Sequence, residues 1–195
     1  MRMETCYDKL EPYIYEKIAQ TLQCVTPILD VGCGDGRLVN FLALKLGKKI
    51  FGVDISDTGF EKAREEAELE NVSSMVEFVK SDASHLAVFE NKSFGGVISV
   101  YTLHEFEDPL VVLKEMGRVL KTGGKVVIAD FIKGGDAERL WGERYHTPTE
   151  IQSMLDDVGF KEVKVSFLYK DVILISALKI RHENCDCWGK PKPDI

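Results

Sequence analysis

Short apolar runs alternate along most of the chain with longer segments in which apolar residues recur every three to four positions. The short runs are typical of buried strands, and the longer segments of amphipathic helices. This pattern predicts strands at 28–31, 49–54, 75–79, 94–100, 126–129, 161–168 and 171–178. It predicts helices at 8–24, 38–46, 57–70, 109–120 and 147–158. Regular alternation of strands and helices is typical of an α/β domain.

The last two predicted strands, 161–168 and 171–178, are separated by only Tyr169 and Lys170. Parallel strands need a crossover connection of a dozen or more residues, whereas antiparallel strands can be joined by two. We therefore expect this final pair to be antiparallel, unlike the strands before it.

Two helix ends carry recognisable signals. Thr147, Pro148 and Glu150 suit the N-cap, first and third positions of a helix, which together form a capping signature. After the helix at 109–120, the pair Gly123-Gly124 predicts a glycine C-cap that turns the chain into the next strand.

Residues 28–38, with the sequence ILDVGCGDGRL, combine a short strand, three glycines spaced G-x-G-x-G and the start of a helix. Glycine allows positive φ and close approach of the backbone to a ligand, and the following helix directs free N–H groups at the loop. A dinucleotide-binding loop would have glycine at the position of Arg37. Asp30, two residues before the first glycine, suits a ligand ammonium group and would repel a pyrophosphate.

This stretch resembles motif I of the class I S-adenosylmethionine (AdoMet) methyltransferases, which has the form [D/E]-x-G-x-G-x-G. The segment RVLKTGGKVVIAD at 118–130 is similar to the corresponding segment of small-molecule methyltransferases. The resemblance covers about residues 8–180 and is closest to the ubiquinone/menaquinone-biosynthesis and sterol type. It implies a Rossmann-like, three-layer fold with a seven-stranded, mostly parallel sheet whose last strand is antiparallel. It also implies AdoMet as the methyl donor.

The cofactor positions follow from this loop and from the ends of the next strands. Asp54 ends the second strand 18 residues after Gly36, where its carboxylate can accept both hydroxyls of a ribose; an N-cap of the next helix is the alternative. The resemblance implies that Asp82 contacts the adenine amino group, with a turn or helix cap as the alternative. We expect Cys33 to be a small apolar filler inside the loop. The candidate cofactor residues are Asp30, Gly32, Cys33, Gly34, Gly36, Asp54, Ile55, Asp82, Ala83 and Val100.

The acceptor side begins after the strand at 94–100, because a ligand in such a sheet lies at the carboxyl ends of the strands where their order reverses. His104 is the best candidate for a general base, followed by Tyr101 and Glu105; helix capping or shaping of the substrate site is the alternative for His104. Tyr145 and His146 are further candidates. A thiolate, thioether, amine or stabilised carbanion acceptor would need little help from a base.

We expect methyl transfer by in-line displacement to a small-molecule acceptor. The N/D-P-P-[YF] signature of amino-group methylation is absent after the strand at 94–100, and the net charge of −7 argues against a nucleic-acid partner. The alternatives are a methyltransferase acting on protein or tRNA, and a non-catalytic AdoMet-binding module. Activity assays and a basic face around the cleft would discriminate them.

Composition indicates a single globular domain over residues 1–180, with 45% hydrophobic and 29% charged residues. No apolar run is long enough to cross a membrane, and the acidic start of the chain predicts no secretory signal. The five cysteines are an odd number without framework spacing, which favours reduced thiols in a cytoplasm.

Two segments leave alternatives open. The helix at 8–24 either packs on the sheet or forms part of a lid, and with no large insertion after Asp130 a second subunit, as in a homodimer, could also cover the substrate. The Cys-containing tail at 181–195 holds His182, Cys185 and Cys187, which are weak candidates for metal ligands or metalloid-linked thiol chemistry. A flexible tail is the alternative.

Overall fold

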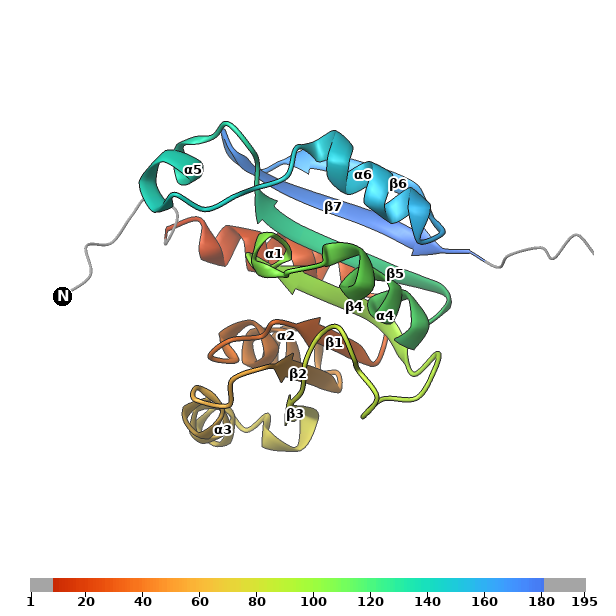
Figure 1. The fold of residues 1–195 in the computed structure, drawn as a ribbon. Helices are drawn as coiled ribbons and strands as arrows, with labels where there is room; N and C mark the ends of the chain where they lie inside the picture. Colours follow the sequence, from red (N-terminus) through yellow and green to blue (C-terminus); the bar gives the residue numbers. More distant parts are fainter. Residues whose placement is uncertain (1–8, 181–195) are drawn as a thin grey trace, which may run out of the picture.

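The computed structural model describes residues 9–180 of the chain, and one seven-stranded sheet forms its centre (Figure 1). The strand order across the sheet is β3-β2-β1-β4-β5-β7-β6. The strands are β1 (Ile28–Val31), β2 (Ile50–Asp54), β3 (Val76–Lys80), β4 (Phe94–Val100), β5 (Leu120–Phe131), β6 (Phe160–Phe167) and β7 (Val172–Lys179). The helices are α1 (Glu11–Leu22), α2 (Arg37–Leu46), α3 (Phe60–Leu69), η1 (Ser73–Met75), η2 (Leu103–Glu105), α4 (Pro109–Val119), α5 (Asp136–Trp141) and α6 (Pro148–Asp157).

Strand pairing confirms the expected topology. β1 pairs in parallel with β2 and β4, and β5 continues the parallel sheet beside β4. β7 is antiparallel to both β5 and β6, so it alone runs against the other strands. The strand order reverses between β1 and β4, and a ligand site is therefore expected at their carboxyl ends.

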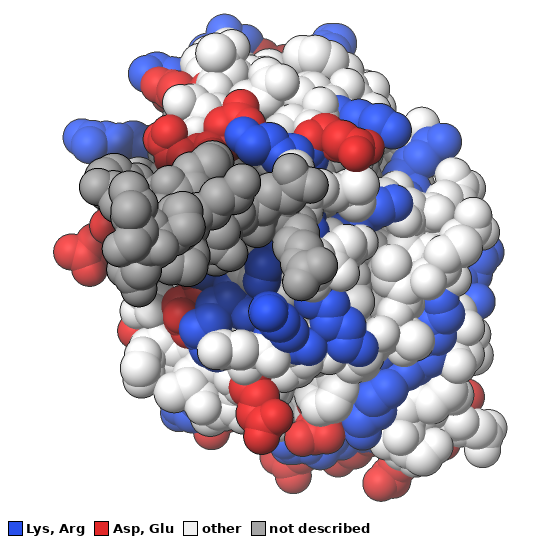
Figure 2. Space-filling model, turned by 90° about the vertical axis from the view of Figure 1, so that its right-hand side faces the viewer, with Lys and Arg blue, Asp and Glu red and all other residues white. Residues whose placement is uncertain are grey.

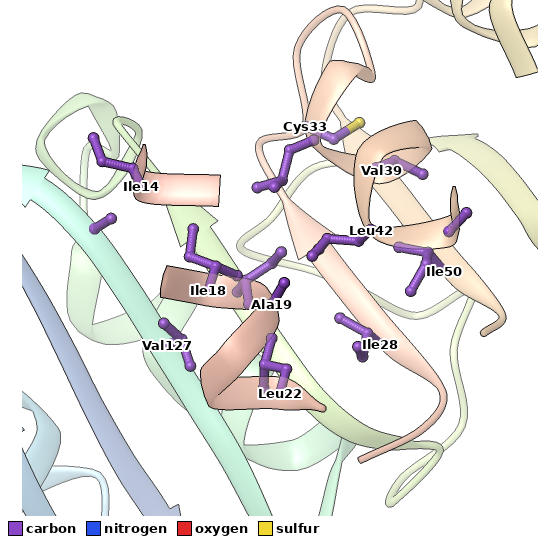
Figure 3. Close-up of a cluster of buried hydrophobic side chains, with 14 of the residues drawn as sticks. Ile14, Ile18, Ala19, Leu22, Ile28, Cys33, Val39, Leu42, Ile50 and Val127 are labelled. Atoms are coloured by element: carbon purple, nitrogen blue, oxygen red, sulfur yellow. The ribbon is translucent and has the colours of Figure 1, made fainter. Parts of the chain in front are cut away.

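Two clusters of buried side chains hold helices on both faces of the sheet. On one face α1 buries Ile14, Ile18 and Leu22 in a cluster that also contains Ile28 of β1 and Val127 of β5 (Figure 3). α4 and α6 supply buried residues to the cluster on the other face. The result is the expected three-layer arrangement, and α1 packs on the sheet.

The start of α6 agrees with the predicted capping signature. Thr147 Oγ1 accepts a hydrogen bond of 3.1 Å from the Glu150 N–H, and Glu150 Oε2 accepts one of 2.7 Å from the Thr147 N–H. Two of the free N–H donors at this helix start, those of Thr147 and Glu150, are thus satisfied by side chains.

The predicted glycine C-cap at the end of α4 is wrong. The C-cap residue of α4 is Leu120, with extended backbone angles of φ −78° and ψ 136°. Leu120 pairs with Phe94 of β4. Strand β5 therefore begins directly after α4, and Gly123 and Gly124 lie within the strand. The positive φ of 78° at Gly123 therefore belongs to β5 and not to a helix end.

Lysines supply donors to the free carbonyls at two helix ends. Lys125 Nζ donates to Thr21 O of α1 at 3.0 Å, and Lys179 Nζ donates to Gly117 O and Leu120 O at the end of α4 at 2.5 and 2.7 Å. Such cations satisfy orphan carbonyls and complement the negative end of a helix. Figure 2 shows Lys and Arg side chains gathered on the face seen from the right of Figure 1, although the whole chain is acidic.

The structure bears on the expectations about membrane spans and metal sites for residues 9–180 alone. None of the helices within residues 9–180 has the length and apolar character to cross a membrane. Within the same range, His, Cys, Asp and Glu side chains form no group of three that could hold a metal ion. His182, Cys185 and Cys187 lie outside the described residues.

Candidate functional site

The three loop glycines all have positive φ, but they meet different surroundings. A Cβ at Gly32 would lie 2.7 Å from the Thr102 side chain, and one at Gly36 would lie 2.6 Å from the ring of Phe78. At Gly34, with φ 52°, no described atom other than those of Gly34 and its two chain neighbours lies within 4 Å of a Cβ position. Packing within the protein thus requires glycine at 32 and 36, whereas Gly34 leaves space open for a ligand.

Asp54 lies at the end of β2, directly beside this loop. Its Oδ2 accepts a hydrogen bond of 2.9 Å from the Gly34 N–H, and its Oδ1 accepts one of 2.9 Å from the Ser56 N–H. The next helix, α3, has Gly59 as its N-cap and no side-chain cap. Asp54 is therefore not a helix cap, and its carboxylate retains lone pairs for the hydroxyls of a ligand.

A cavity of about 740 Å³ opens at the carboxyl ends of these strands. Five of the predicted cofactor residues line it: Gly32, Asp54, Ile55, Asp82 and Ala83. The Ile55 side chain is 70% exposed, which makes an apolar surface available to a flat ring. Asp82 Oδ1 accepts a hydrogen bond from the Ser84 N–H, which lowers the pKa of Asp82. This bond forms a turn, the alternative role expected for Asp82.

Asp30 lies beneath the loop and is 2% exposed. Its Oδ1 has no hydrogen-bond partner among the described residues. Burial, with the nearby charge of Asp54, raises the pKa of Asp30 to about 8. A buried carboxyl oxygen without a donor suits a cationic group, so this site fits a ligand that carries both an ammonium and a ribose.

The remaining predicted cofactor residues do not line this cavity. Cys33 is buried in the core, its Sγ would be 2.8 Å from a Cβ at Gly52, and burial raises the pKa of its thiol. Val100, at the end of β4, packs against the same core cluster. These positions agree with an apolar filler at Cys33, and the assignment of Val100 to the cofactor stays a prediction.

His104, in the short helix η2, is held by Asp130 at the end of β5. Nδ1 of His104 lies 2.8 Å from Asp130 Oδ1, and the His104 backbone N–H donates to Asp130 Oδ2 at 3.1 Å. The Phe131 N–H also donates to Asp130 Oδ1 at 2.8 Å. Burial lowers the pKa of His104, but the hydrogen bond and charge of Asp130 outweigh it, and the net shift is upward.

The second ring nitrogen of His104, Nε2, lies beside the segment after α5. Nε2 of His104 lies 3.2 Å from Glu143 Oε2, and the Tyr145 hydroxyl donates to the same oxygen at 2.6 Å. The centroids of the Tyr145 and His104 rings lie 4.4 Å apart. Burial raises the pKa of Glu105, which lines the cavity next to this group.

The structure brings Tyr101 and Tyr145 together through one aromatic residue. Tyr101 has a positive φ of 57° and stacks on Phe131 at 4.5 Å, and the Phe131 ring also contacts Trp141 at 5.1 Å and Tyr145 at 5.5 Å. His146 instead pairs through its backbone with Ile132. We call Tyr101, Phe131, Trp141 and Tyr145 the aromatic cluster.

The sequence predicts that residues 101–106 face the reacting methyl group, but it did not identify Asp130 and Glu143 as residues of the site. Thr102 and Phe106 line the cavity, and Asp130 and Glu143 contact His104. The acid that directly follows the apolar run at 126–129 was a usable signal for Asp130, because the carboxyl ends of neighbouring parallel strands meet at one edge of the sheet. Nothing in the local sequence marks Glu143.

A family model described as a methyltransferase domain matches residues 29–128. The methyltransferase GfsG of Streptomyces halstedii is 31% identical over 128 residues, which cover 66% of this chain and 45% of that protein. The chloroplastic 2-phytyl-1,4-beta-naphthoquinone methyltransferase of Arabidopsis thaliana is 34% identical over 114 residues, covering 56% of this chain and 43% of that protein.

A solved structure shows the same fold. The geranyl diphosphate C-methyltransferase of Streptomyces coelicolor, in complex with Mg²⁺, geranyl diphosphate and S-adenosyl-L-homocysteine, superposes with a TM-score of 0.78 at 15% identity, covering 88% of this chain and 78% of that one. The chain spans less than half the length of the two curated relatives named above.

Proposed function

Because the chain belongs to the methyltransferase domain family, whose methyl donor is S-adenosylmethionine, we propose that it methylates a small-molecule acceptor by in-line displacement. The curated relatives include enzymes named for sterol and naphthoquinone methylation. These names support a small-molecule acceptor for this chain. The donor, when bound, supplies an activated methyl group on a sulfonium centre.

One observation carries the proposal: Asp54 and the exposed Ile55 line one cavity, and the Asp54 carboxylate also accepts from the N–H of Gly34, where a Cβ would meet open space. In our assignment Asp54 binds the ribose hydroxyls, and Ile55 with Ala83 flanks the adenine. Asp82 accepts from the adenine amino group. Asp30, with its unpartnered buried oxygen, receives the ammonium of the methionine part.

The residues around His104 supply the acceptor side of the proposed reaction. Asp130 accepts from Nδ1 of His104, so Nε2 is the nitrogen that exchanges a proton with the acceptor. Alignment of the acceptor with the methyl group provides most of the acceleration, because the leaving group is already good. A positioned base adds about 10²- to 10⁴-fold where the acceptor must lose a proton.

Calorimetric titration of the full chain with AdoMet tests the cofactor assignment. We expect Asp54→Ala to weaken binding by about 1–3 kcal/mol, the usual loss when polar groups of a ligand are left unpaired. Asp57→Ala is the matched control, because Asp57 is an exposed acid three residues away that pairs with Lys80. Equal affinities for the two variants, or no binding by the folded wild-type protein, would contradict the assignment.

Turnover separates the enzyme from its alternatives. A panel of small hydroxylated and carbon acceptors, with protein and tRNA fractions beside it, is incubated with methyl-labelled AdoMet. Label in a small molecule supports the proposal, and label only in protein or tRNA contradicts the acceptor class. Tight AdoMet binding with no labelled product in any fraction would favour a binding module.

A further inference from the structure

One carboxylate oxygen on the acceptor side is shared by two fixed polar groups. Oε2 of Glu143 lies 3.2 Å from Nε2 of His104, and it accepts the 2.6 Å hydrogen bond from the Tyr145 hydroxyl. Packing fixes both partners, since Tyr145 is 4% exposed and the His104 side chain 5% exposed. The position of this oxygen is therefore within hydrogen-bond reach of a proton acceptor and of a donor that the fold holds in place.

Glu143 itself is the least constrained member of this group. Its side chain is 48% exposed, and residues 142–145 belong to neither a helix nor a strand. Gly142, just before it, has a φ of 71°, and no described atom lies within 4 Å of its Cβ position. Because the Glu143 side chain is half exposed and its segment has no helix or strand pairing to hold it, a ligand group of the right chemistry can replace this carboxylate.

We propose that Glu143 Oε2 marks the position of the acceptor's oxygen, and that a flat hydroxylated acceptor, such as a phenol or enol, displaces Glu143 from His104 and Tyr145. This inference rests on the proposed function and names the acceptor class for the same site. The Tyr145 ring belongs to the aromatic cluster, so a planar apolar body beside the hydroxyl finds apolar and aromatic neighbours.

The position is linked to the cofactor cavity through η2, because His104 contacts Glu143 and the next residue, Glu105, lines the cavity. Glu105 lines that cavity, and its pKa is raised by burial and by the charges of Glu143, Asp130 and Asp54. These charges act on one side chain from both the ribose end and the acceptor end of the site. Because His104 and Glu105 are consecutive residues, an oxygen bound to His104 lies next to a residue that lines the cavity.

The proposed step transfers one methyl group and moves one proton. The acceptor oxygen forms a bond to the methyl carbon as the carbon–sulfur bond of the donor breaks and its electron pair stays on sulfur. The hydroxyl proton passes to Nε2 of His104, and the Tyr145 hydroxyl donates to the acceptor oxygen. Products are the methyl ether, S-adenosylhomocysteine and one proton that His104 later releases to water.

Displacement of Glu143 also changes the charge around His104. The groups that face the imidazole are Asp130 from β5, Glu143 and Tyr145 from the segment after α5, and Glu105 from its own helix. With Glu143 in place, two carboxylates contact the ring and favour imidazolium, which cannot accept a proton. When a neutral hydroxyl replaces one of them, the imidazolium loses its proton more readily and Nε2 becomes available as a base.

Binding of 4-nitrophenol to the full chain tests the inference without AdoMet. The ionised form of this probe absorbs visible light, so both binding and proton loss are observed, and nitrobenzene serves as the analogue without a hydroxyl. We expect Glu143→Ala to bind 4-nitrophenol about two- to fivefold more tightly, because the competing carboxylate is gone. Glu138→Ala, on the adjacent helix α5, is the control and is expected to bind like the wild type.

Further variants make the test decisive. Adding Tyr145→Phe to Glu143→Ala should remove the gain, and His104→Gln should reduce the ionised fraction of the bound probe. Unchanged or weaker 4-nitrophenol binding by Glu143→Ala, or an equal gain for nitrobenzene, overturns the inference. Because no step needs AdoMet, failure of the cofactor titration would be seen separately from failure of this test.

Discussion

The backbone N–H of Gly34 donates a 2.9 Å hydrogen bond to Oδ2 of Asp54, and so joins the loop after β1 to the end of β2. Two more hydrogen bonds, from the N–H groups of Gly32 and Cys33 to Val53 O at 2.8 and 3.0 Å, fix the same loop to the same strand. The loop therefore has its shape before a ligand arrives. A preformed site loses less conformational entropy on binding, which favours affinity.

Gly36→Ala and Gly34→Ala should differ in their effect on stability. A Cβ at Gly36 would lie 2.6 Å from Phe78 Cε1 and 2.7 Å from the Cβ of Ala63, in addition to the strain of φ 76°. We expect this variant to lose about 2–4 kcal/mol of unfolding free energy. Gly34→Ala has only backbone strain and should lose about 1–2 kcal/mol. Urea denaturation of both variants gives the comparison, and equal losses would contradict the packing argument.

Gly34→Ala should instead show its main effect on AdoMet. The open space at Gly34 becomes occupied by a methyl group, so we expect a tenfold or greater loss of affinity, about 1.4 kcal/mol or more. Calorimetry under conditions where the variant is folded measures this loss. Wild-type affinity would show that the ligand does not approach the backbone at Gly34.

Asp30→Asn should make the protein more stable at neutral and alkaline pH. The folded-state pKa of Asp30, about 8, lies above the unfolded value near 3.9, so the folded protein binds the extra proton between these values. Stability therefore falls as pH rises from about 4 to 8, and the neutral amide removes this loss. We expect a gain of the order of a few kcal/mol at pH 8 that shrinks towards pH 4.

Urea denaturation at several pH values checks this, with Asp35→Asn in the exposed part of the same loop as the control. The gain should be accompanied by weaker AdoMet binding, because the amide no longer offers a charge to the ammonium group. A variant that is more stable and still binds AdoMet normally would remove Asp30 from the cofactor site. A difference in stability that does not change with pH would contradict the titration of a buried carboxyl.

Local sequence patterns predicted the sheet well because buried parallel strands are continuous apolar runs and loop glycines follow them directly. Asp54 could be placed for the same reason, since it ends such a run. The six-residue helix α5 is too short to show periodicity. Gly123 was misread because the pairing of Leu120 with Phe94, a long-range contact, ends α4 first.

The acceptor side was harder to predict than the cofactor side. The position of Glu143 depends on how residues 142–147 lie against the end of β5, where Ile132 pairs with His146. No residue pattern encodes that path, so the second carboxylate at His104 could not be predicted. His104 itself was identified because it follows β4 directly.

Thr147→Ala should destabilise the protein by about 1 kcal/mol. The change removes the Oγ1 acceptor of the Glu150 N–H and leaves the Glu150 carboxylate to hold only the Thr147 backbone. Thr149→Ala, at an exposed position two residues after Thr147, is the control and should change stability by less than about 0.5 kcal/mol. Thermal unfolding of the two variants is sufficient, and equal midpoints would contradict the capping contribution.

Asp130→Asn should destabilise the protein, and more at pH 6 than at pH 9. Both oxygens of Asp130 accept from N–H groups, of His104 and Phe131, so an amide places its own NH₂ against one of these donors. We expect a loss of about 2–4 kcal/mol from this mismatch in a buried site. The loss has a second part that depends on the charge of His104.

The sign of that pH dependence follows from the upward shift of the His104 pKa. A raised folded-state pKa contributes stability that is fully present below the unfolded value of about 6.5 and is lost as pH rises through the folded value. Removing the Asp130 charge therefore removes more stability at pH 6 than at pH 9. Urea denaturation of wild type and variant at both values measures the difference, and His104→Gln in the wild-type and Asp130→Asn backgrounds completes the cycle. If the loss from Asp130→Asn is the same at both pH values, or persists unchanged in the His104→Gln background, Asp130 does not stabilise a charged imidazole. The proton at Nε2 would then have to be held by Glu143 alone.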